Sequence, residues 1–561
     1  MNKTLRSSSR ISFTCLSLLL VSVLGTGCVP SLEGNEPREA KKEVPKNFNP
    51  PPGAPSSDSP TTGPSSGKRN WNDFFVSPEL RTLVDTALKN NQELNIRLQE
   101  IIIAHAEVSA RKGEYLPKLS AGVGAGVEKV GRSTRNGTVD EAFGLPENMG
   151  DFSFGLMGSW EIDVWKKLRN SANAANYRFL ASVEGRNFMV TQLVAEIARS
   201  YYELTALDNQ LDVLKRNIAI QTDALEVVKL EKMAARVTEL AVQRFEAEVF
   251  KNRSRLYDLE QQRIEAENRI NFLVGRFPQP VQRDSAKFKE PLPQVLQTGV
   301  PSELLENRPD VKQAELDLEA AKLDVKAAKA GFYPSLKIDA GVGYNSFNLD
   351  HIVTTPESLI YNVAGNLTAP LLNRAAIKAQ YRSANARQLQ AVFSYERTIL
   401  QAFTDVANQI AKIDNLKKGY DLQAQQVDKL THATEISVIL FTSARADYME
   451  VLLTRRDSLD AELELIETKK QQLQTMVNMY QALGGGWRAT GQAKPGTKEQ
   501  PSAAPGATGS TAPASAPATT AQKPGAGEAQ AETSAAPAEP AALAGPAAKP
   551  ATAAPAPPPA P

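Results

Sequence analysis

Side chains that could catalyse a reaction or bind a metal ion are few in this chain and lie far apart. The three histidines are His105, His351 and His432. Only His432 has a possible metal ligand at helical spacing, Asp428 four residues earlier, and one such pair on a charged helix is most often a solvated surface. We find no nucleophile accompanied by a base. The sequence therefore predicts no enzyme activity, no metal site and no cofactor.

Two glycine-rich runs could be mistaken for phosphate-binding loops. The run Gly484–Trp487 ends a helical pattern instead of opening one, and no Lys-Ser or Lys-Thr pair follows it. It is better interpreted as a helix stop. Gly122, Gly124 and Gly126 alternate with apolar residues inside a predicted strand, where small side chains explain them without a nucleotide.

Cys28 is the one residue for which the sequence predicts a covalent modification. Met1–Gly27 has the form of an export signal, with basic residues before an apolar run that ends in small residues. Leu24–Cys28 resembles the lipobox of bacterial lipoproteins, although Gly25 stands where the leucine usually is. Cys28 is then either the acylated first residue of the mature chain, carrying fatty acids such as palmitate, or an ordinary residue near a cleavage site. Cys15 lies inside the signal, so the mature chain can form no internal disulfide.

Two stretches of the chain lack residues that end a helix. No proline occurs between Pro146 and Pro278 or between Pro370 and Pro495. We expect helices of about forty to fifty residues there, roughly 60 to 75 Å long. Apolar stripes at steps of three and four residues favour coiled-coil packing, and taken alone they are typical of a soluble bundle. The stripes are Leu204, Leu207, Leu211, Leu214 and Ile218, then Leu459, Leu463, Ile466, Lys470, Leu473, Val477 and Tyr480.

A helix-to-strand junction occurs twice. In Gly113–Gly124 and Gly331–Tyr344 a charged helical pattern meets Pro117 or Pro334, after which the side chains alternate with a period of 2. Similar residues follow in the same order downstream of both junctions. The chain is therefore predicted to be an internal duplication with a unit of roughly 210 residues, far longer than a solenoid repeat.

Four segments of alternating side chains, 119–127, 152–164, 336–344 and 361–369, predict two β-hairpins joined by polar loops at about 131–150 and 349–358. One face of each segment is apolar, and the other is small or polar. This pattern is typical of membrane-spanning strands, while a soluble sheet packed on the helices is the alternative. Four strands cannot close a barrel in lipid, so several chains must contribute.

The composition of the two ends differs from that of the body, and we divide the chain accordingly. The charge is balanced, with Lys+Arg 64 and Asp+Glu 63, which gives no reason to expect a nucleic-acid partner. The predicted parts are a signal peptide at 1–27, a lipid-anchored disordered tether at 28–70, a first repeat at 71–280 with a hairpin at about 119–164, a linker at 281–300, a second repeat at 301–487 with a hairpin at about 336–370, and a disordered Ala/Pro-rich tail at 488–561.

Four parts of the chain carry a resemblance to a known family. They are Val300–Asp310, Ala327–Leu336, Tyr395–Glu396 with Gln401–Ala407, and Ala482–Trp487. Together they resemble the TolC-like outer-membrane factors, in particular the lipoprotein branch of multidrug efflux systems. The likeness spans about residues 72–487.

The resemblance implies a mainly α-helical chain with a membrane β-barrel. Each internally duplicated protomer would contribute four strands to a twelve-stranded barrel of a homotrimer in the outer membrane, continued by a helical tunnel across the periplasm. It also implies a passive duct that exports small molecules or ions and works with a periplasmic adaptor and an inner-membrane pump. The alternatives are a duct for type I protein secretion and a lipid-anchored coiled-coil scaffold without a pore.

The sequence differs from the family that it resembles in the region expected to form the periplasmic gate. That family closes its tunnel with acidic rings near a glycine-containing turn, and the corresponding run here is Phe441–Arg456. Asp447 and Glu450 are the nearest acids, so either could form the constriction. The alternative is that both are ordinary solvated turn residues. Possible basic partners are Arg236, Arg445, Arg455 and Arg456.

Overall fold

The computed structural model describes residues 29–32, 34, 36–45, 48, 65–290, 298–372, 374–443 and 445–488. The predicted signal peptide, Cys28, part of the predicted tether and linker, and the predicted tail after Arg488 lie outside the described residues. The elements are η1 (Ser66–Lys68), α2 (Trp71–Phe74), α3 (Pro78–Asn90), α4 (Gln92–Glu114), β1 (Lys118–Glu128), α5 (Arg135–Ala142), β2 (Met149–Ile162), α6 (Lys167–Met233), α7 (Glu239–Val274), η2 (Ser285–Lys289), α8 (Glu303–Asn307), α9 (Pro309–Ala330), β3 (Ser335–Ser346), η3 (Leu349–His351), β4 (Leu359–Thr368), α10 (Ala375–Thr442) and α11 (Tyr448–Ala482).

Two of the helices are longer than the sequence suggested. α6 has 67 residues and α10 has 68 residues, so each extends roughly 100 Å. The predicted length of about forty to fifty residues was too short. α6 continues through Gly185 and α10 through Gly419, the one glycine that each helix contains. A single glycine costs only about 1 kcal/mol in a helix that is otherwise well packed. None of the described helices is both long enough and apolar enough to cross a membrane.

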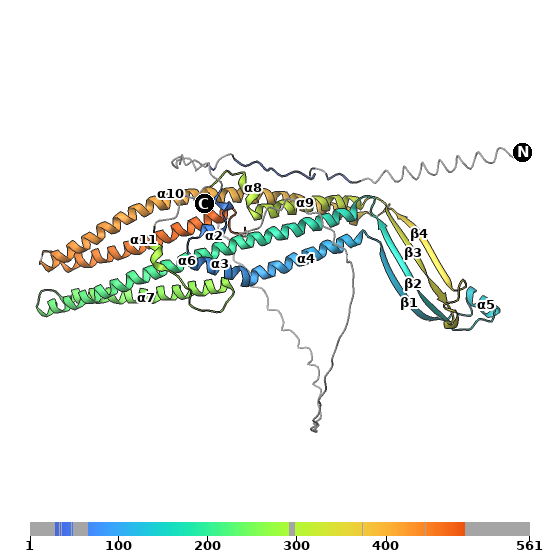
Figure 1. The fold of residues 1–561 in the computed structure, drawn as a ribbon, viewed down its shortest axis with the longest axis horizontal. Coiled ribbons are helices and arrows are strands. Elements are labelled where there is room, and N and C mark those ends of the chain that lie inside the picture. Colours follow the sequence, from blue (N-terminus) through green and yellow to red (C-terminus); the bar gives the residue numbers. More distant parts are fainter. Residues whose placement is uncertain are drawn as a thin grey trace, which may run out of the picture. The chain divides into compact units, whose positions relative to one another are not determined.

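The long helices lie side by side. Near the sheet the order is α4, α6, α9 and α10, and at the far end it is α7, α6, α11 and α10 (Figure 1). Thus α10 forms one lateral edge of this wall along its whole length, and α4 and α7 form the other edge. The two halves of the duplication contribute equivalent elements: a shorter helix, a hairpin, a very long helix and a returning helix.

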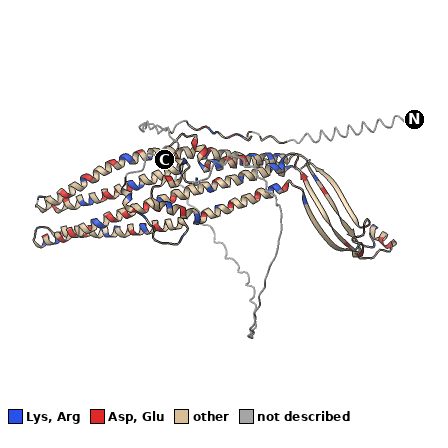
Figure 2. Ribbon diagram, in the orientation of Figure 1, with Lys and Arg blue, Asp and Glu red and all other residues tan. Residues whose placement is uncertain are grey.

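The four strands form one antiparallel sheet in the order β1-β2-β3-β4. The register aligns the predicted apolar positions: Val123 lies opposite Phe154, which lies opposite Tyr344, and Val342 lies opposite Tyr361. The two predicted hairpins are confirmed, with β2 starting a few residues earlier than expected. Figure 2 shows that charged residues are dense on the helices and sparse on the strands.

The first hairpin loop, predicted as a polar loop at about 131–150, contains helix α5. Its N-cap is Thr134, whose hydroxyl accepts a hydrogen bond from the Gly137 N–H at 3.2 Å. Eight residues without an apolar stripe carry almost no periodic signal, which is why the sequence did not indicate this helix.

The main core lies where α6, α7 and α11 pack together with α3. The predicted stripes are buried there, including Leu204 and Leu214 of α6 and Leu459 and Leu463 of α11. Lys470, the polar member of the second stripe, keeps its ammonium 2.9 Å from Glu467. Helix α11 ends as predicted at the glycine run, with Gly484 in the left-handed region at φ 79°.

Residues 36–45 differ from the disordered tether that the sequence suggested. They lie against α9 and α10 and form ion pairs with both helices. The polar composition that argued against a core supplies these ion pairs. Residues 65–70, also assigned to the tether, include η1.

Candidate functional site

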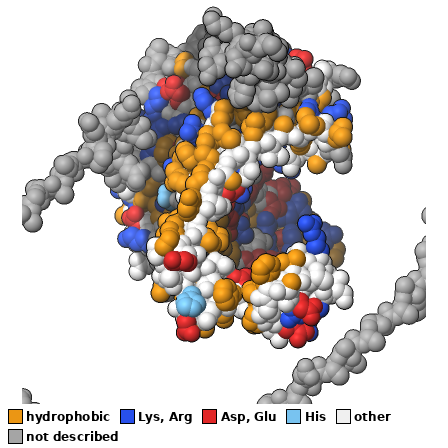
Figure 3. Space-filling view, turned by 90° about the vertical axis from the view of Figure 1, so that its right-hand side faces the viewer, with side chains coloured by type: hydrophobic (Ala, Val, Ile, Leu, Met, Phe, Trp, Pro, Cys, Tyr) orange, Lys and Arg blue, Asp and Glu red, His pale blue; other side chains and the backbone are white. Residues whose placement is uncertain are grey.

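One face of the sheet is an exposed apolar surface. The outward side chains Val123, Tyr361 and Val363 are 89%, 79% and 78% exposed. Figure 3 shows apolar side chains running along the strands at this end of the molecule. A continuous apolar surface of this kind marks contact with lipid or with a partner.

The opposite face of the sheet carries mostly polar residues and glycines, with Met157 and Ile360 as exposed apolar exceptions. Lys337 and Asp339 form an ion pair at 3.1 Å, and Asn366 Nδ2 donates to Asp339 at 3.2 Å. Gly155 and Gly343 lie opposite each other, and a Cβ added to Gly343 would come within 2.8 Å of Gly155 Cα. This face suits the water-filled side of a membrane barrel.

Within the described part of the chain, β1 and β4 pair on one side only. Their other sides present unpaired backbone N–H and C=O groups. In lipid each unpaired group costs several kcal/mol, so such edges must be paired by another strand. The sheet is therefore an incomplete barrel.

Aromatic side chains mark the base of the sheet, the end that joins the helices. Trp160 Nε1 donates to the Tyr115 carbonyl at 3.1 Å. Trp165 Nε1 donates to the Pro334 carbonyl at 2.8 Å, and its ring stacks on Tyr333 at 4.7 Å between centroids. Rings that have an apolar body and a satisfied polar atom are typical of a membrane boundary.

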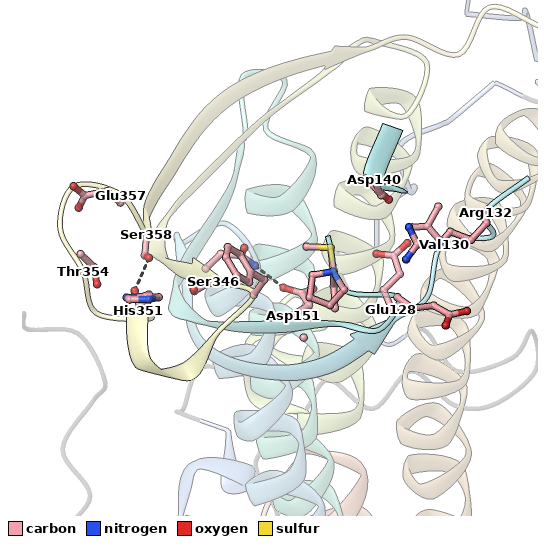
Figure 4. A pocket seen from close by; sticks show the side chains of 16 residues that line it. Glu128, Val130, Arg132, Asp140, Asp151, Ser346, His351, Thr354, Glu357 and Ser358 are labelled. Carbon is pink, nitrogen blue, oxygen red and sulfur yellow. Dashed lines mark hydrogen bonds between the residues drawn. The ribbon is translucent and has the colours of Figure 1, made fainter. Parts of the chain in front are cut away.

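The loops at the outer end of the sheet enclose a hollow of about 710 Å³ (Figure 4). Asn345 Nδ2 donates to Asp151 at 2.7 Å, and Ser358 Oγ donates to the His351 carbonyl at 2.6 Å. Glu128 and Glu357 also line it. Among the described residues, no group of three or more acidic, histidine or cysteine side chains could hold a metal ion.

The predicted gate residues lie at the tip of the wall farthest from the sheet, where α10 turns into α11 (Figure 1). Asp447 is the N-cap residue of α11, and Glu450 lies in its first turn. Arg445 donates its backbone N–H to the Leu440 carbonyl. All three side chains are exposed. The described residues of one chain include no ion pair that involves any of the three. Ala444, in the same turn, is outside the described residues.

Two of the other basic residues considered as gate partners, Arg236 and Arg456, also lie near this end of the wall. The Arg456 guanidinium lies 3.2 Å from Asp457. Arg236 follows Ala235, which adopts φ 55° in the turn between α6 and α7.

A layer of polar residues near the tip, with Gln221 and Asn252 buried and Arg455 half-buried, was not predicted. Arg455 lies on the same side of α11 as Leu452 and Leu459, at the position between them in the leucine stripe. Leu452 packs on the apolar cluster at the tip, and Leu459 belongs to the main core. Gln221 of α6 and Asn252 of α7 lie between members of the same two clusters, and Asn252 Nδ2 donates to Gln221 Oε1 at 2.8 Å. We call these three residues the polar layer.

The polar layer has more donors than acceptors. Among the described residues, buried Gln221 Nε2 and Arg455 Nε and Nη1 find no acceptor. Burial lowers the pKa of the Arg455 guanidinium. The signal in the sequence was an arginine on an extension of the leucine stripe toward the tip.

The Arg308 motif, in contrast, is structural. The Arg308 guanidinium donates to both carboxylate oxygens of Asp310 at 2.7 and 3.0 Å. It also donates to Asp405 at 3.2 Å and to the Ala482 carbonyl at 3.1 Å. One buried side chain thus joins α9, α10 and the end of α11.

Comparisons with known proteins agree with this architecture. The family model described as outer membrane efflux protein matches residues 83–276 and 300–485. The pyoverdine export outer membrane protein OpmQ of Pseudomonas aeruginosa is 30% identical over 76% of this chain and 89% of its own length. The probable outer membrane lipoprotein SilC of Salmonella typhimurium is 26% identical over 74% and 88%.

Solved structures share the fold. The Campylobacter jejuni CmeC outer membrane channel superposes with a TM-score of 0.73 at 20% identity and covers 82% of this chain and 96% of its own. The open-state Neisseria gonorrhoeae MtrE channel gives 0.69 at 23% identity, with 82% and 98% covered. The predicted likeness to efflux channels is confirmed, and the family is one of transport channels. The chain belongs to the outer membrane efflux protein family and is an outer-membrane efflux channel.

Proposed function

We propose that three copies of this chain close one twelve-stranded barrel and one helical tunnel, forming a passive exit duct. The observation that carries the proposal is the sheet with two free edges and one apolar face. β4 of one copy pairs with β1 of the next, which removes both edges and leaves the apolar face toward lipid.

The edges of the helical wall support the same assembly. Ile102 and Ile103 of α4 and Phe272 of α7 are exposed on one side, and Phe393 and Leu400 of α10 are exposed on the other. An apolar edge on each side of the wall matches a ring in which each copy packs against two neighbours.

The cargo we propose is small molecules or ions, delivered by an inner-membrane pump through a periplasmic adaptor. The names of similar proteins support this class, since they include pyoverdine export, a cation efflux system and a solvent efflux pump. A duct for secreted protein is the alternative within the same architecture. A scaffold without a pore would not need the apolar face or the free strand edges.

Acylation of Cys28 is part of the proposal. Val29 and Leu32 pack with Phe332 and Tyr381 next to the base of β3. The first described residues after Cys28 are therefore held near the membrane boundary, which supports a lipid anchor on the residue that precedes them. Cys28→Ser should abolish incorporation of labelled fatty acid and leave assembly intact, because the barrel holds the membrane more strongly than one acyl chain. Unchanged labelling would refute the assignment.

For the gate we propose that three copies of Asp447 or Glu450 narrow the tip and select cations, with Arg445 as a neighbouring charge. Their exposure at the tip supports this role, because three-fold symmetry brings exposed like charges together there. Asp447→Ala, Glu450→Ala and the double variant should raise single-channel conductance or reduce cation selectivity. If none of them does so, the gate lies elsewhere.

The assembly is tested by a disulfide that only neighbouring copies can form. β1 and β4 are separated by two strands, so their Cα atoms are roughly 14 Å apart within one copy. That separation is too large for a disulfide. Val123→Cys is combined in turn with Tyr361→Cys, Val363→Cys and Leu367→Cys, which sample the unknown register between copies.

Oxidation in membranes should convert at least one pair into a covalent trimer, whereas each single variant should yield no trimer. If every pair leaves only monomer, the edges do not meet and the proposed closure is wrong.

A further inference from the structure

Residues 29–48 run along α9 and α10 of the helical wall, as far as they are described. Val29 and Leu32 contact the cluster next to the base of the sheet. Ala40, Val44 and Phe48 contact a second cluster farther along α9 and α10. The segment thus runs along the helices away from the membrane boundary. We call it the strap.

Glu396 of α10 receives three hydrogen bonds from the strap. Arg38 Nη1 and Nη2 donate to its two carboxylate oxygens at 2.9 and 2.8 Å. The Lys41 backbone N–H donates to the same carboxylate at 3.0 Å. About two turns before Glu396 on α10, Gln388 Nε2 donates to the Arg38 carbonyl at 2.9 Å. The Arg38 guanidinium also lies 4.7 Å from the centre of the Phe393 ring.

Charged residues of the strap also pair with α9. Lys42 Nζ lies 2.6 Å from Glu315, and Lys322 Nζ lies 2.6 Å from Glu39. The strap therefore bridges two neighbouring helices, α9 through Glu315 and Lys322 and α10 through Glu396. The ring of Phe48 stacks on Phe403 of α10 at 5.3 Å between centroids, which holds the far end.

An isolated exposed ion pair contributes little, because water and salt screen it. The contacts at Glu396 differ from such a pair in their number and geometry. A planar guanidinium matches a carboxylate with two parallel hydrogen bonds, which fixes orientation as well as distance. The backbone donor of Lys41 adds a contact that only one placement of the chain can make. Glu396 is thus a specific recognition site for this segment.

We propose that Glu396 is the docking carboxylate for the strap and that the docked strap braces α9 against α10. Docking holds the strap in one path, from the base of the sheet along α9 and α10. It also places the segment after Cys28 beside the base of β3. This inference goes beyond the export function and does not depend on it, since it concerns one chain.

The test measures docking by the reactivity of a cysteine in the strap. Ala40→Cys places a thiol at a partly buried position that packs against the second cluster. Glu43→Cys places one at an exposed position of the same segment and serves as the reference for an undocked thiol. Maleimide labelling rates are measured on the full chain in membranes, with the parent protein as the background for Cys28.

Glu396→Gln and Arg38→Gln should each raise the labelling rate of Ala40→Cys several-fold, toward that of the Glu43→Cys reference. Salt at about 1 M should have the same effect, because the Debye length is then only about 3 Å. Glu435→Gln, an exposed change elsewhere on α10, is the matched control and should leave the rate unchanged.

Exchanging the charges, Arg38→Glu with Glu396→Arg, should restore part of the protection that either single reversal removes. Arg38→Gln lies on the strap itself, so it tests docking even if a change at Glu396 disturbs folding of the wall. If neither Glu396→Gln nor Arg38→Gln changes the labelling rate of Ala40→Cys, Glu396 does not dock the strap and the proposal is overturned.

Discussion

Replacing Arg455 by leucine should stabilise the tip of the helical wall. Its Nε and Nη1 atoms are buried without an acceptor among the described residues. A buried unpaired donor costs about 1–3 kcal/mol when fully desolvated. The Arg455 side chain is only partly buried, so we expect about 1–3 kcal/mol for both donors together. Leucine removes this cost and joins the apolar clusters on either side of the polar layer.

Hydrogen exchange measures this effect locally. For Arg455→Leu, amides near the polar layer on α6, α7 and α11 should exchange roughly 5- to 150-fold more slowly, since about 1.4 kcal/mol corresponds to a factor of ten. Lys470→Leu is the matched control on the same stripe. Lys470 already has a partner in Glu467 at 2.9 Å, so its replacement should change exchange much less.

Faster exchange in Arg455→Leu would refute the reasoning. It would mean that the guanidinium holds a carboxylate in the assembled protein and that removing it breaks a pair. Unchanged exchange would mean that water already satisfies the buried donors.

Further changes test the fold at single positions through thermal unfolding. Gly484→Ala should lower the free energy of unfolding by at least about 1–2 kcal/mol, because φ is 79° and the added Cβ would lie 2.6 Å from the Asn307 carbonyl oxygen. Gly419→Ala is the control. This glycine lies within a helix with open space around it, so the change should be neutral or stabilising. Burial raises the pKa of the Asp317 carboxyl, so the folded chain binds this proton more tightly than the unfolded chain. The stability that this gives is complete below the unfolded pKa and is lost as pH rises from there through the folded pKa. Asp317→Asn should therefore be more stable than the parent at neutral pH and equal to it near pH ~3. Burial opposes ionisation of Asp208, but hydrogen bonds from Arg283 and Ser285 outweigh it and lower its pKa, so the advantage of the parent over Asp208→Asn should be present at neutral pH and disappear as pH falls below about 4.

The sheet was predictable because its signal is local. Val123, Phe154, Val342 and Tyr361 fall on one face through simple alternation, and the register of the strands keeps them there. The helices were predictable in kind but not in length, since only tertiary packing decides whether a residue such as Gly185 interrupts a helix.

Contacts between distant segments left no local trace. Arg38 and Glu396 are 358 positions apart, and although Tyr395–Glu396 belongs to a run that carries the family resemblance, nothing in either segment indicates that the two residues pair. The strap was therefore interpreted as a tether from its composition. Arg455 was considered only as a gate partner, because the sequence does not show whether an arginine near a turn faces water or the core. Its position on the extended leucine stripe was the available signal.

Single-channel recording of the purified complex in a planar lipid bilayer, with its mass determined on the same sample, tests the central claim most directly. We predict a complex of three chains that conducts in discrete steps. Three sheets with free edges close one barrel, and its lumen continues into the tunnel that the three helical walls enclose. A chain that stays monomeric in detergent and never conducts would contradict the account.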